Sequence, residues 1–458
     1  MDDSRLRFKS PDEEALLRID RISVENFRAF SHLSVSFDPY LTVLVAPNGG
    51  GKTAVLDALA VAVGPFVGAF DEATGVHFSA ADCRIESSRA HGLREEEPQY
   101  PIEVCVNGEI GGVASTWMRQ LTSAKSHTTY ADCRNLIEYA KQLQRRVRET
   151  ASSQGEGVTL PLVSYYGTGR LWNEKRLTLG RRFEARTSRT AGYTNCLDSA
   201  SKYKIFVDWF ERLTMAQFQE RNNPEVFAML QARSDAIRQA VDTVLAPSGW
   251  SGIAFRSAEA GITATHRTKG VLPVDWLSDG VRNLIGLTAD IAHRAVRLNS
   301  HMGVEAALQT PGIVLIDEID MHLHPSWQQT VVASMRQAFP RMQFIVTTHS
   351  PQVLTTVRAA NIRLLSEDAT VQIPAEVGTF GAASSRVLEE VFGVPSRPES
   401  VSVVAQLRDY LRMVDDGRSK SLEALLLRKE LEDALGTHDP DLLLADIRAS
   451  QIEFIGRR

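Results

Sequence analysis

A glycine-rich string between two apolar segments carries the first recognisable chemistry in this sequence. Residues 46–53 read APNGGGKT, which matches the phosphate-binding pattern G-x-x-x-x-G-K-[ST] except that Ala46 replaces the first glycine. Its glycines allow backbone N–H groups to turn toward phosphate oxygens, Lys52 adds a positive charge, and Thr53 offers a hydroxyl to Mg²⁺. The alternative is an ordinary glycine-rich turn, but the apolar run before the string and the helical pattern after it favour a phosphate loop.

Two adjacent carboxylates end a later apolar run. Residues 313–318 read IVLIDE, so Asp317 and Glu318 lie where a buried strand is expected to finish. Beside a phosphate loop, Asp317 is suited to hold the hydrated Mg²⁺ and Glu318 to polarise an attacking water. Taken alone, an apolar run that ends in Asp-Glu is often only a capped strand.

A histidine and a serine occupy comparable positions. The string FIVTTHSP at 344–351 predicts another buried strand with His349 at its carboxyl end, where open α/β sheets place ligand contacts. His349 is therefore either a γ-phosphate sensor or a structural histidine. In LSDGVRNLIGL, at 277–287, Ser278 and Gly280 begin a helix whose N-terminus either attracts an anion or is simply capped.

These positions require strands and helices in a regular order. The apolar and helical periodicities predict strands at 41–45, 312–316 and 343–347, and helices at 53–62, 280–298 and 326–338. Residues 22–37 alternate loosely and predict two edge-type strands. The pattern predicts an α/β core whose two halves are far apart in the sequence.

The segment between the two halves has a different character. Residues 101–106 and 111–117 flank the turn signal Asn107-Gly108 and predict a hairpin, and helical patterns follow at 136–148, 201–212 and 224–245. We therefore expect an inserted α+β lobe. The Arg-rich, poorly patterned stretch at 173–196 predicts a mobile loop. Its arginines, which include Arg181, Arg182 and Arg186, form either a DNA-backbone patch or a solvated charge run.

The order of these motifs resembles the ABC-type ATPase superfamily. A phosphate loop, a Leu-Ser-x-Gly helix start, an Asp-Glu strand end and a strand-end histidine follow one another, and the resemblance covers about 20–62 and 271–365. It implies an α/β fold of ABC-type head, with a mixed sheet around the phosphate loop, and ATP and Mg²⁺ as cofactors. It also implies head-to-tail dimers in which Ser278 and Gly280 contact the γ-phosphate held by another subunit.

Departures from the transporter pattern narrow this resemblance. The signature reads LSDGV rather than LSGGQ, about 220 residues separate Lys52 from Ser278, and Asp82 is the best candidate for the metal-linked position that a glutamine usually fills. The string NFRAF at 26–30 is similar to the SMC/RecF-like branch, which places Arg28 near the nucleotide. No sustained heptads for coiled-coil arms are present.

The resemblance implies three sets of site residues. The catalytic set is Glu318, Lys52 and His349. The metal set is Thr53, Asp317 and Asp82. The nucleotide-binding set is Asn48, Gly49, Gly50, Gly51, Lys52, Thr53, Ala54, Arg28, Ser278 and Gly280.

Further strings are similar to a narrower group, the ATPase subunits of Septu and retron-associated anti-phage systems typified by PtuA. They are YYGTGRLW at 165–172, the 189–209 stretch, DEIDMHLHPSWQ at 317–328 and FGVPSRP at 392–398. This similarity implies an oligomeric ATPase whose nucleotide state controls a separate HNH nuclease similar to PtuB, with DNA or retron nucleic acid as a further partner. The alternatives are a RecF/SMC-like DNA-repair ATPase without a nuclease partner, and a transporter-like or purely regulatory nucleotide switch.

Three other features have less specific interpretations. His322 and His324 could hold a cation but are more readily explained as contacts between ABC-type subunits. Arg170 is either a phosphate or DNA contact or an ion-pair partner. The C-terminal 90 residues read as helices, and Asp439-Pro440-Asp441 is typical of a helix start, so we expect no nuclease site in this chain.

Composition sets the wider limits. The 458 residues are 43% hydrophobic and 23% charged with a formal charge of -5, which gives no overall basic field for nucleic acid. The spacing of the four cysteines predicts reduced thiols. No apolar run is long enough for a signal peptide or a membrane span, so we expect a cytoplasmic protein without a membrane partner. The expected domains are 1–85, 86–270, 271–365 and a helical assembly or partner-binding region at 366–458.

Overall fold

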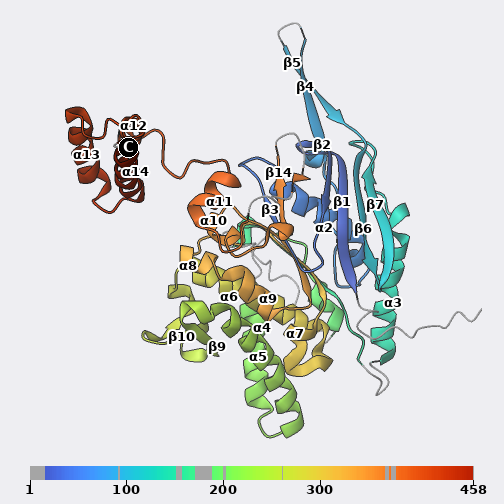
Figure 1. Cartoon of the computed structure of the whole chain (residues 1–458). Coiled ribbons are helices and arrows are strands. Elements are labelled where there is room, and N and C mark those ends of the chain that lie inside the picture. Colours follow the sequence, from blue (N-terminus) through green and yellow to red (C-terminus); the bar gives the residue numbers. More distant parts are fainter. Residues whose placement is uncertain are drawn as a thin grey trace, which may run out of the picture. The chain divides into compact units, whose positions relative to one another are not determined.

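A computed structural model of the chain describes residues 16–90, 93–150, 157–170, 188–199, 203–259, 261–366, 371–372 and 378–456. The chain divides into two compact units, Met1–Val387 and Leu388–Arg458 (Figure 1). The first unit contains the sheets and all of the predicted site residues. The second is helical.

The central sheet of the first unit is built from apolar strands. Its order is β15 (Val371–Gln372), β14 (Ile362–Leu365), β3 (Leu41–Val45), β13 (Met342–Thr347), β12 (Gly312–Ile316) and β8 (Leu162–Tyr166). All neighbours are parallel except β15, which is antiparallel to β14. Strands β8, β12 and β13 are buried along their whole lengths, as is usual for a parallel sheet covered on both faces. Their carboxyl ends lie at one edge, so the segments that follow β3, β12 and β13 are brought together.

A second, antiparallel sheet has the order β2 (Phe30–Ser36), β1 (Leu17–Phe27), β6 (Ile102–Ile110) and β7 (Val113–Leu121). The predicted turn at Asn107-Gly108 is wrong, because the chain turns at Gly111-Gly112. Gly108 lies within β6 instead, where an added Cβ would be 2.1 Å from the Arg18 carbonyl oxygen of β1. The glycine at 108 is thus explained by the close approach of a neighbouring strand.

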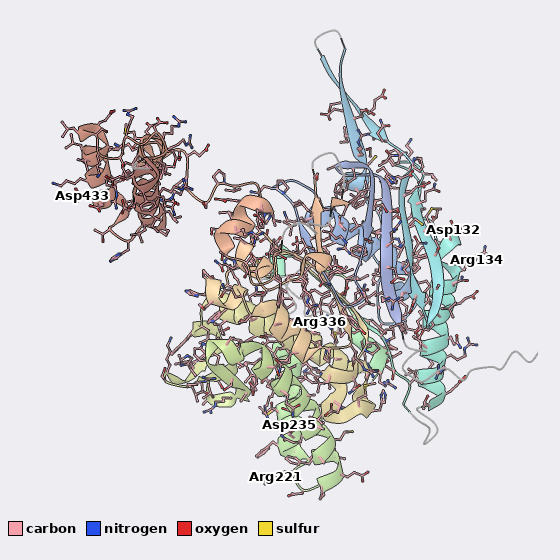
Figure 2. The ribbon with its side chains drawn as sticks, viewed as in Figure 1. Asp132, Arg134, Arg221, Asp235, Arg336 and Asp433 are labelled. Carbon is pink, nitrogen blue, oxygen red and sulfur yellow. The ribbon has the colours of Figure 1, made fainter. Side chains whose placement is uncertain are left out.

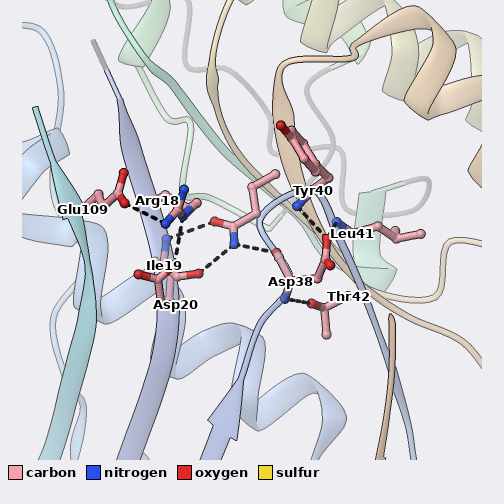
Figure 3. A network of polar contacts seen from close by, with 9 residues as sticks. Arg18, Ile19, Asp20, Asp38, Tyr40, Leu41, Thr42 and Glu109 are labelled. Atoms are coloured by element: carbon pink, nitrogen blue, oxygen red, sulfur yellow. Dashed lines mark hydrogen bonds and ion pairs between the residues drawn. The ribbon is translucent and has the colours of Figure 1, made fainter. Parts of the chain in front are cut away.

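A network of polar contacts around Ile19 and Asp38 joins the two sheets (Figure 3). Gln343, on β13, donates to the carbonyl oxygens of Ile19 (2.7 Å) and Asp38 (3.0 Å) and accepts from the Ile19 N–H at 3.0 Å. Asp38 in turn accepts from the backbone N–H groups of Tyr40 and Leu41. These bonds fix the start of β3, and therefore the phosphate loop after it, relative to β1.

Helix α2 (Lys52–Gly68) follows the phosphate loop and is apolar on almost every side. It contacts β1, β6 and β7 of the antiparallel sheet, β13 of the central sheet, and α3 (Arg134–Thr150). The Trp117 indole donates to the Ala62 carbonyl oxygen at 3.0 Å, and the buried Arg119 guanidinium donates to that of Val61 at 2.9 Å. Helix α2 is therefore held by both sheets.

Helices and a small sheet complete the first unit. The helices are α4 (Tyr203–Gln219), α5 (Pro224–Leu245), α6 (Asp279–Leu298), α7 (Ala306–Gln309), α8 (Pro325–Gln328), α9 (Val331–Ala338) and α10 (Pro351–Leu354). The small sheet has the order β11 (Gly270–Pro273), β10 (Gly261–His266) and β9 (Trp250–Arg256), and a separate hairpin pairs β4 (Arg84–Ala90) with β5 (Leu93–Gln99). Helix α5 contacts α4, α6, α9 and β9.

Two observed features differ from the expected organisation. Strands β6, β7 and β8 belong to the range expected as an inserted lobe, 86–270, yet they pair with core strands. The single helix expected at 326–338 is divided into α8 and α9. The Thr330 hydroxyl donates to the Trp327 carbonyl oxygen at 3.1 Å, a local bond that competes with a continuous helix.

The second unit is a small helical core. Helix α11 (Ser384–Glu390) crosses the boundary between the units, and α12 (Ser402–Asp415), α13 (Leu422–Leu435) and α14 (Pro440–Gly456) lie within the second unit. Their shared core is Leu407, Tyr410, Val414, Ala424, Leu431, Leu442 and Ala445. The Asp439 carboxylate accepts from the N–H groups of Asp441 and Leu442, which confirms the helix start predicted at Asp439-Pro440-Asp441.

Acidic and basic side chains lie on several elements of both units (Figure 2). Asp132 and Arg134 lie at the start of α3, Asp235 is on α5 and Asp433 is on α13. The four cysteines are thiols. In the part of the chain that the structure describes, no helix combines the length and apolarity needed to cross a bilayer.

Candidate nucleotide-binding site

The phosphate loop connects β3 to α2 with two glycines in a left-handed conformation. Gly49 has φ 81° and Gly51 has φ 83°, values that side chains with a Cβ rarely adopt. At Gly51 an added Cβ would also be 2.1 Å from the Phe30 ring, and at Gly50 it would be 2.7 Å from the Ala46 methyl group. The Ala46 side chain therefore occupies space that is open only because residue 50 is glycine, and the exchange of Gly for Ala at the first position fits the loop.

Lys52 links the end of the phosphate loop back to its beginning. Its ammonium group donates to the carbonyl oxygens of Ala46 at 3.0 Å and Pro47 at 3.4 Å. The residue is 6% exposed, and burial lowers its pKa even though Asp317, Glu318 and Asp320 act in the opposite direction. An ammonium group that donates to two carbonyl oxygens of the loop directs its positive charge at the loop rather than at solvent.

The acidic pair lies directly beside the loop. Asp317 is 1% exposed and accepts from the Thr53 hydroxyl at 2.7 Å and from the Thr347 hydroxyl at 2.6 Å. The Glu318 N–H donates to the same Thr347 hydroxyl at 2.8 Å, and Glu318 has φ 48°. The structure thus brings together Thr53, Asp317 and Glu318 from segments separated by 264 positions, as the motif interpretation expects.

The segment after β13 supports the acids. Thr347 bonds Asp317 and Glu318, and the Thr348 hydroxyl donates to Asp320 at 2.5 Å. His349 follows at once and is half-buried, while the Ser350 hydroxyl accepts from the N–H groups of Gln352 and Val353 at the start of α10. Sequence reasoning missed Thr347 and Thr348. The two hydroxyls immediately before His349, at the end of a buried strand, were the available signal.

The signature segment packs on the loop that follows the acidic pair. Ser278 precedes α6 and is exposed, and Gly280 is buried with the His322 carbonyl oxygen 2.4 Å from where its Cβ would be. The Asn283 amide donates to the Met321 carbonyl oxygen at 3.3 Å. Glycine at 280 is thus required by a close backbone approach. Within the described residues, the Ser278 hydroxyl makes no capping hydrogen bond to α6.

A buried ion pair fixes α6 against the edge of the central sheet. Asp290 accepts from the Arg294 guanidinium at 2.8 Å and from the Tyr166 hydroxyl at 2.7 Å, and the Tyr166 carbonyl oxygen accepts from the Asp317 N–H at 2.8 Å. Arg294 also donates to the carbonyl oxygens of Gly192 and Thr194. Burial and Asp290 raise the pKa of the Tyr166 hydroxyl well above its usual value, so it stays a donor. The signature helix and Asp317 are therefore held by one strand end.

Arg28 and Asp82 lie in a different arrangement from the one expected. The Arg28 guanidinium donates to Asp82 at 3.0 and 2.9 Å and to Asp57, on α2, at 2.5 Å. Asp82 also accepts from the Ser79 hydroxyl at 2.9 Å and the Ser79 N–H at 2.8 Å. Burial raises the pKa of Asp57, against the effects of Arg28 and of the Tyr165 hydroxyl that donates to it. The bonds of Asp82 go to Arg28 and Ser79 rather than to Thr53 or Asp317.

The remaining candidates have other roles or fall outside the described residues. The His324 ring accepts from the Ser326 N–H at the start of α8, and among the residues described there is no group of three His, Cys, Asp or Glu side chains placed to bind a metal. Arg189 donates to the Leu298 carbonyl oxygen at 2.8 Å, a contact inside the unit. The Arg170 side chain and the segment 171–187, with Arg181, Arg182 and Arg186, lie outside the described residues.

Comparison with known protein families agrees with this site. A model described as AAA domain matches residues 21–241. A second AAA-domain model, whose description names the AbiEii toxin of a type IV toxin–antitoxin system, matches residues 148–355. Together these matches include both the phosphate loop and the acidic pair.

Similar proteins carry related names. The chain is 25% identical to "Retron Ec83 probable ATPase" of Escherichia coli, over 94% of this chain and 86% of that protein. It is 26% identical to "Retron Vc95 probable ATPase" of Vibrio cholerae, over 77% of this chain and 74% of that protein. It is 42% identical to "Septu protein PtuA" of Bacillus mycoides over 92 residues, which are 20% of this chain and 12% of that protein. Among solved structures, an SMC head bound to the C-winged helix domain of ScpA matches 78% of this chain and 97% of that chain, at 16% identity and a TM-score of 0.47.

Proposed function

Because this chain is an AAA-domain ATPase with relatives among the retron and Septu ATPases, we propose that it is the ATPase subunit of a cytoplasmic anti-phage defence complex. In this proposal its nucleotide state regulates a partner HNH nuclease similar to PtuB. The names of the relatives support the defence role. The absence from the sequence of any nuclease constellation supports a separate cutting subunit.

The observation that supports ATP hydrolysis most directly is the hydrogen bond between the Thr53 hydroxyl and the Asp317 carboxylate, at 2.7 Å. A hydroxyl and a carboxylate in contact are the hard oxygen ligands that Mg²⁺ prefers, so these residues fit the ion, which would neutralise charge on the phosphates when bound. Lys52 stabilises negative charge on the β- and γ-phosphates. Glu318, held by Thr347, orients the water and accepts its proton, and His349 contacts the γ-phosphate.

The assembly part rests on the exposed signature. Ser278 is exposed, and Gly280 and Asn283, at the start of α6, pack on the segment around His322. A helix N-terminus with an exposed serine is suited to an anion from another molecule. We therefore assign Ser278 and Gly280 to the nucleotide bound by a second copy, in head-to-tail dimers.

Partner binding is assigned to the C-terminal unit. Helices α13 and α14 keep one face in the core of the unit but expose large apolar side chains on other faces, which is unusual for a helix that contacts only solvent. The exposed side chains are Leu422, Leu425, Leu426, Leu443, Leu444, Ile447 and Phe454. A small unit with this much exposed apolar surface is well suited to a protein partner.

The deciding experiment is co-expression with the neighbouring HNH protein. We expect the two to co-purify, the mass of the complex to differ between ATP and ADP, and DNA or retron nucleic acid to be cut only in one nucleotide state. A variant with Leu425→Glu and Ile447→Glu should lose the nuclease while keeping ATP hydrolysis. If the two proteins co-purify but the nuclease activity of the complex is the same with ATP and with ADP, the regulatory role is refuted.

A second candidate is a RecF/SMC-like DNA-repair ATPase without a nuclease partner. The observation in its favour is 45% identity over 93 residues to "DNA double-strand break repair Rad50 ATPase" of Methanopyrus kandleri, 20% of this chain and 9% of that protein. Hydrolysis stimulated by DNA in the purified chain alone, with no HNH protein bound in cells, would favour this candidate.

A further inference from the structure

One tryptophan stands exposed next to the signature serine. Trp276 is 76% exposed, the highest value for a large apolar side chain among the described residues, and it lies two positions before Ser278. Tryptophan offers a large contact area at low entropic cost and is over-represented among the residues that dominate protein interfaces. Its position therefore needs an explanation that the fold of one chain does not provide.

The backbone presents this side chain in a fixed way. Trp276 ends a short 3₁₀ turn, Val274–Trp276, in which the Leu277 N–H donates to the Val274 carbonyl oxygen at 3.0 Å. Val274 and Leu277 on either side are buried, at 0% and 8% exposure. Both flanking residues are anchored in the interior, so the exposure of the indole is built into the turn rather than caused by a loose loop.

Other exposed residues belong to the signature segment and to the loop on which it packs. Ser278 is exposed, and Gly280 lies against the backbone of His322, which is itself exposed and has φ 61°. The phosphate loop provides a second open surface, because Pro47, Asn48 and Gly49 are all exposed. One chain thus carries two uncovered surfaces, one with the signature and one with the phosphate loop.

We propose that Trp276 is the anchor by which the signature surface docks on the phosphate-loop surface of a second copy of this chain. The inference rests on the proposed head-to-tail dimer and adds the residue that holds it together. The nucleotide site is incomplete without the second copy, because Ser278 and Gly280 come from it. Contact between the indole and the second copy would place that helix N-terminus at the bound phosphates.

The test measures dimer formation in a background that retains ATP. In the Glu318→Gln chain with ATP and Mg²⁺, we expect a dimer by mass measurement across a range of protein concentrations. Adding Trp276→Ala should weaken dimer formation at least tenfold, and Trp276→Phe should recover part of the loss. ATP binding by the single copy should stay unchanged. Phe218, on α4 and 66% exposed, provides a matched control, and Phe218→Ala should leave dimer formation unaltered.

Indole accessibility gives an independent measurement. The difference in acrylamide quenching between the Glu318→Gln chain and its Trp276→Phe form reports on residue 276 alone. The indole should become protected from acrylamide when ATP induces the dimer. A thermal melt of Trp276→Ala that matches the melt of the parent chain excludes misfolding of the variant. If ATP yields a dimer that forms equally well in Trp276→Ala, the proposed role of Trp276 is wrong, but the proposed dimer is retained. If ATP yields no dimer in the parent, both proposals fail. Loss of the nuclease or of nucleic acid alone, with dimer formation intact, would assign Trp276 to that partner instead.

Discussion

The phosphate-loop half and the signature half of the proposed site differ in how far one chain satisfies them. Around the loop, Lys52, Thr53 and Asp317 are linked to carbonyls, hydroxyls and one another. Around the signature, Ser278 and Trp276 are exposed. Under the proposed head-to-tail arrangement, a single copy binds the nucleotide, whereas hydrolysis needs the signature of a second copy. Substitutions in each half of the site, and in the interior behind the signature, can therefore separate the two contributions.

The largest effect is expected from Glu318→Gln in the loop half. The amide keeps the size of the side chain and cannot accept the proton of the water, so we expect phosphate release to fall by about 100-fold or more. ATP should remain bound. Phosphate release measures hydrolysis, and retention of labelled ATP measures binding. Near-normal turnover would show that Glu318 does not accept the proton of the attacking water.

Ser278→Arg disturbs the signature half. A bulky cation at the start of α6 should abolish hydrolysis but leave ATP binding by the single copy intact. Mixing this chain with Lys52→Ala chains places one intact loop opposite one intact signature, so random pairing at equal amounts should restore about a quarter of the normal rate. Rescue absent at every mixing ratio would contradict a site shared between copies.

Gly280→Ala should have a smaller effect on the same half. The new Cβ would lie 2.4 Å from the His322 carbonyl oxygen, so the backbone there must move. We expect hydrolysis to fall three- to tenfold, with ATP binding unchanged. Gly378→Ala is the matched control, since nothing lies within 4 Å of its added Cβ. Equal rates for the two variants would show that the contact does not position the signature.

The smallest effect concerns the interior behind the signature. His293, on α6, packs on the Trp209 ring at a centroid distance of 4.2 Å, and burial lowers its pKa to about 3. Its two ring nitrogens have no hydrogen-bond partner among the described residues. The unfolded chain binds this proton near pH 6.5 and the folded chain does not, so the histidine costs stability as the pH falls below that value.

We therefore expect the free energy of unfolding to drop by about 1 kcal/mol between pH 8 and pH 6 because of this residue. His293→Phe should remove that part of the pH dependence. Urea unfolding of both chains at the two pH values measures it, and the exposed His32 provides the control variant His32→Phe. Identical pH slopes for parent and His293→Phe would mean that the folded chain binds the His293 proton as readily as the unfolded chain does.

The sequence predicted those parts of the molecule that depend on local patterns. The strands β3, β12 and β13 are largely apolar, and the motifs at their ends fall where the α/β rules place them. The proximity of Thr53 to Asp317 and Glu318 could be predicted from the sequence, because the chemistry of the motifs places these residues around one ion. The helices of the C-terminal unit likewise follow from their own periodicity and caps.

The features that sequence reasoning missed depend on distant partners. Nothing near Asp82 indicates that Arg28 would bind it, or that Asp57 on α2 would share the same guanidinium. The pairing of β6 with β1 explains Gly108 better than the turn signal that Asn107-Gly108 resembles. Thr347 was passed over because a threonine at a strand end is common, and its function becomes visible only when Asp317 lies beside it.

The Asp290–Arg294 pair has a mechanical consequence. Arg294 is bonded to two backbone carbonyls as well as to Asp290, and Asp290 to Tyr166 at the end of β8. Sliding α6 along its axis would leave a charge stranded in the interior, which costs several kcal/mol. If hydrolysis displaces this region, we therefore expect α6 and the end of β8 to shift together, without sliding of the helix along its own axis.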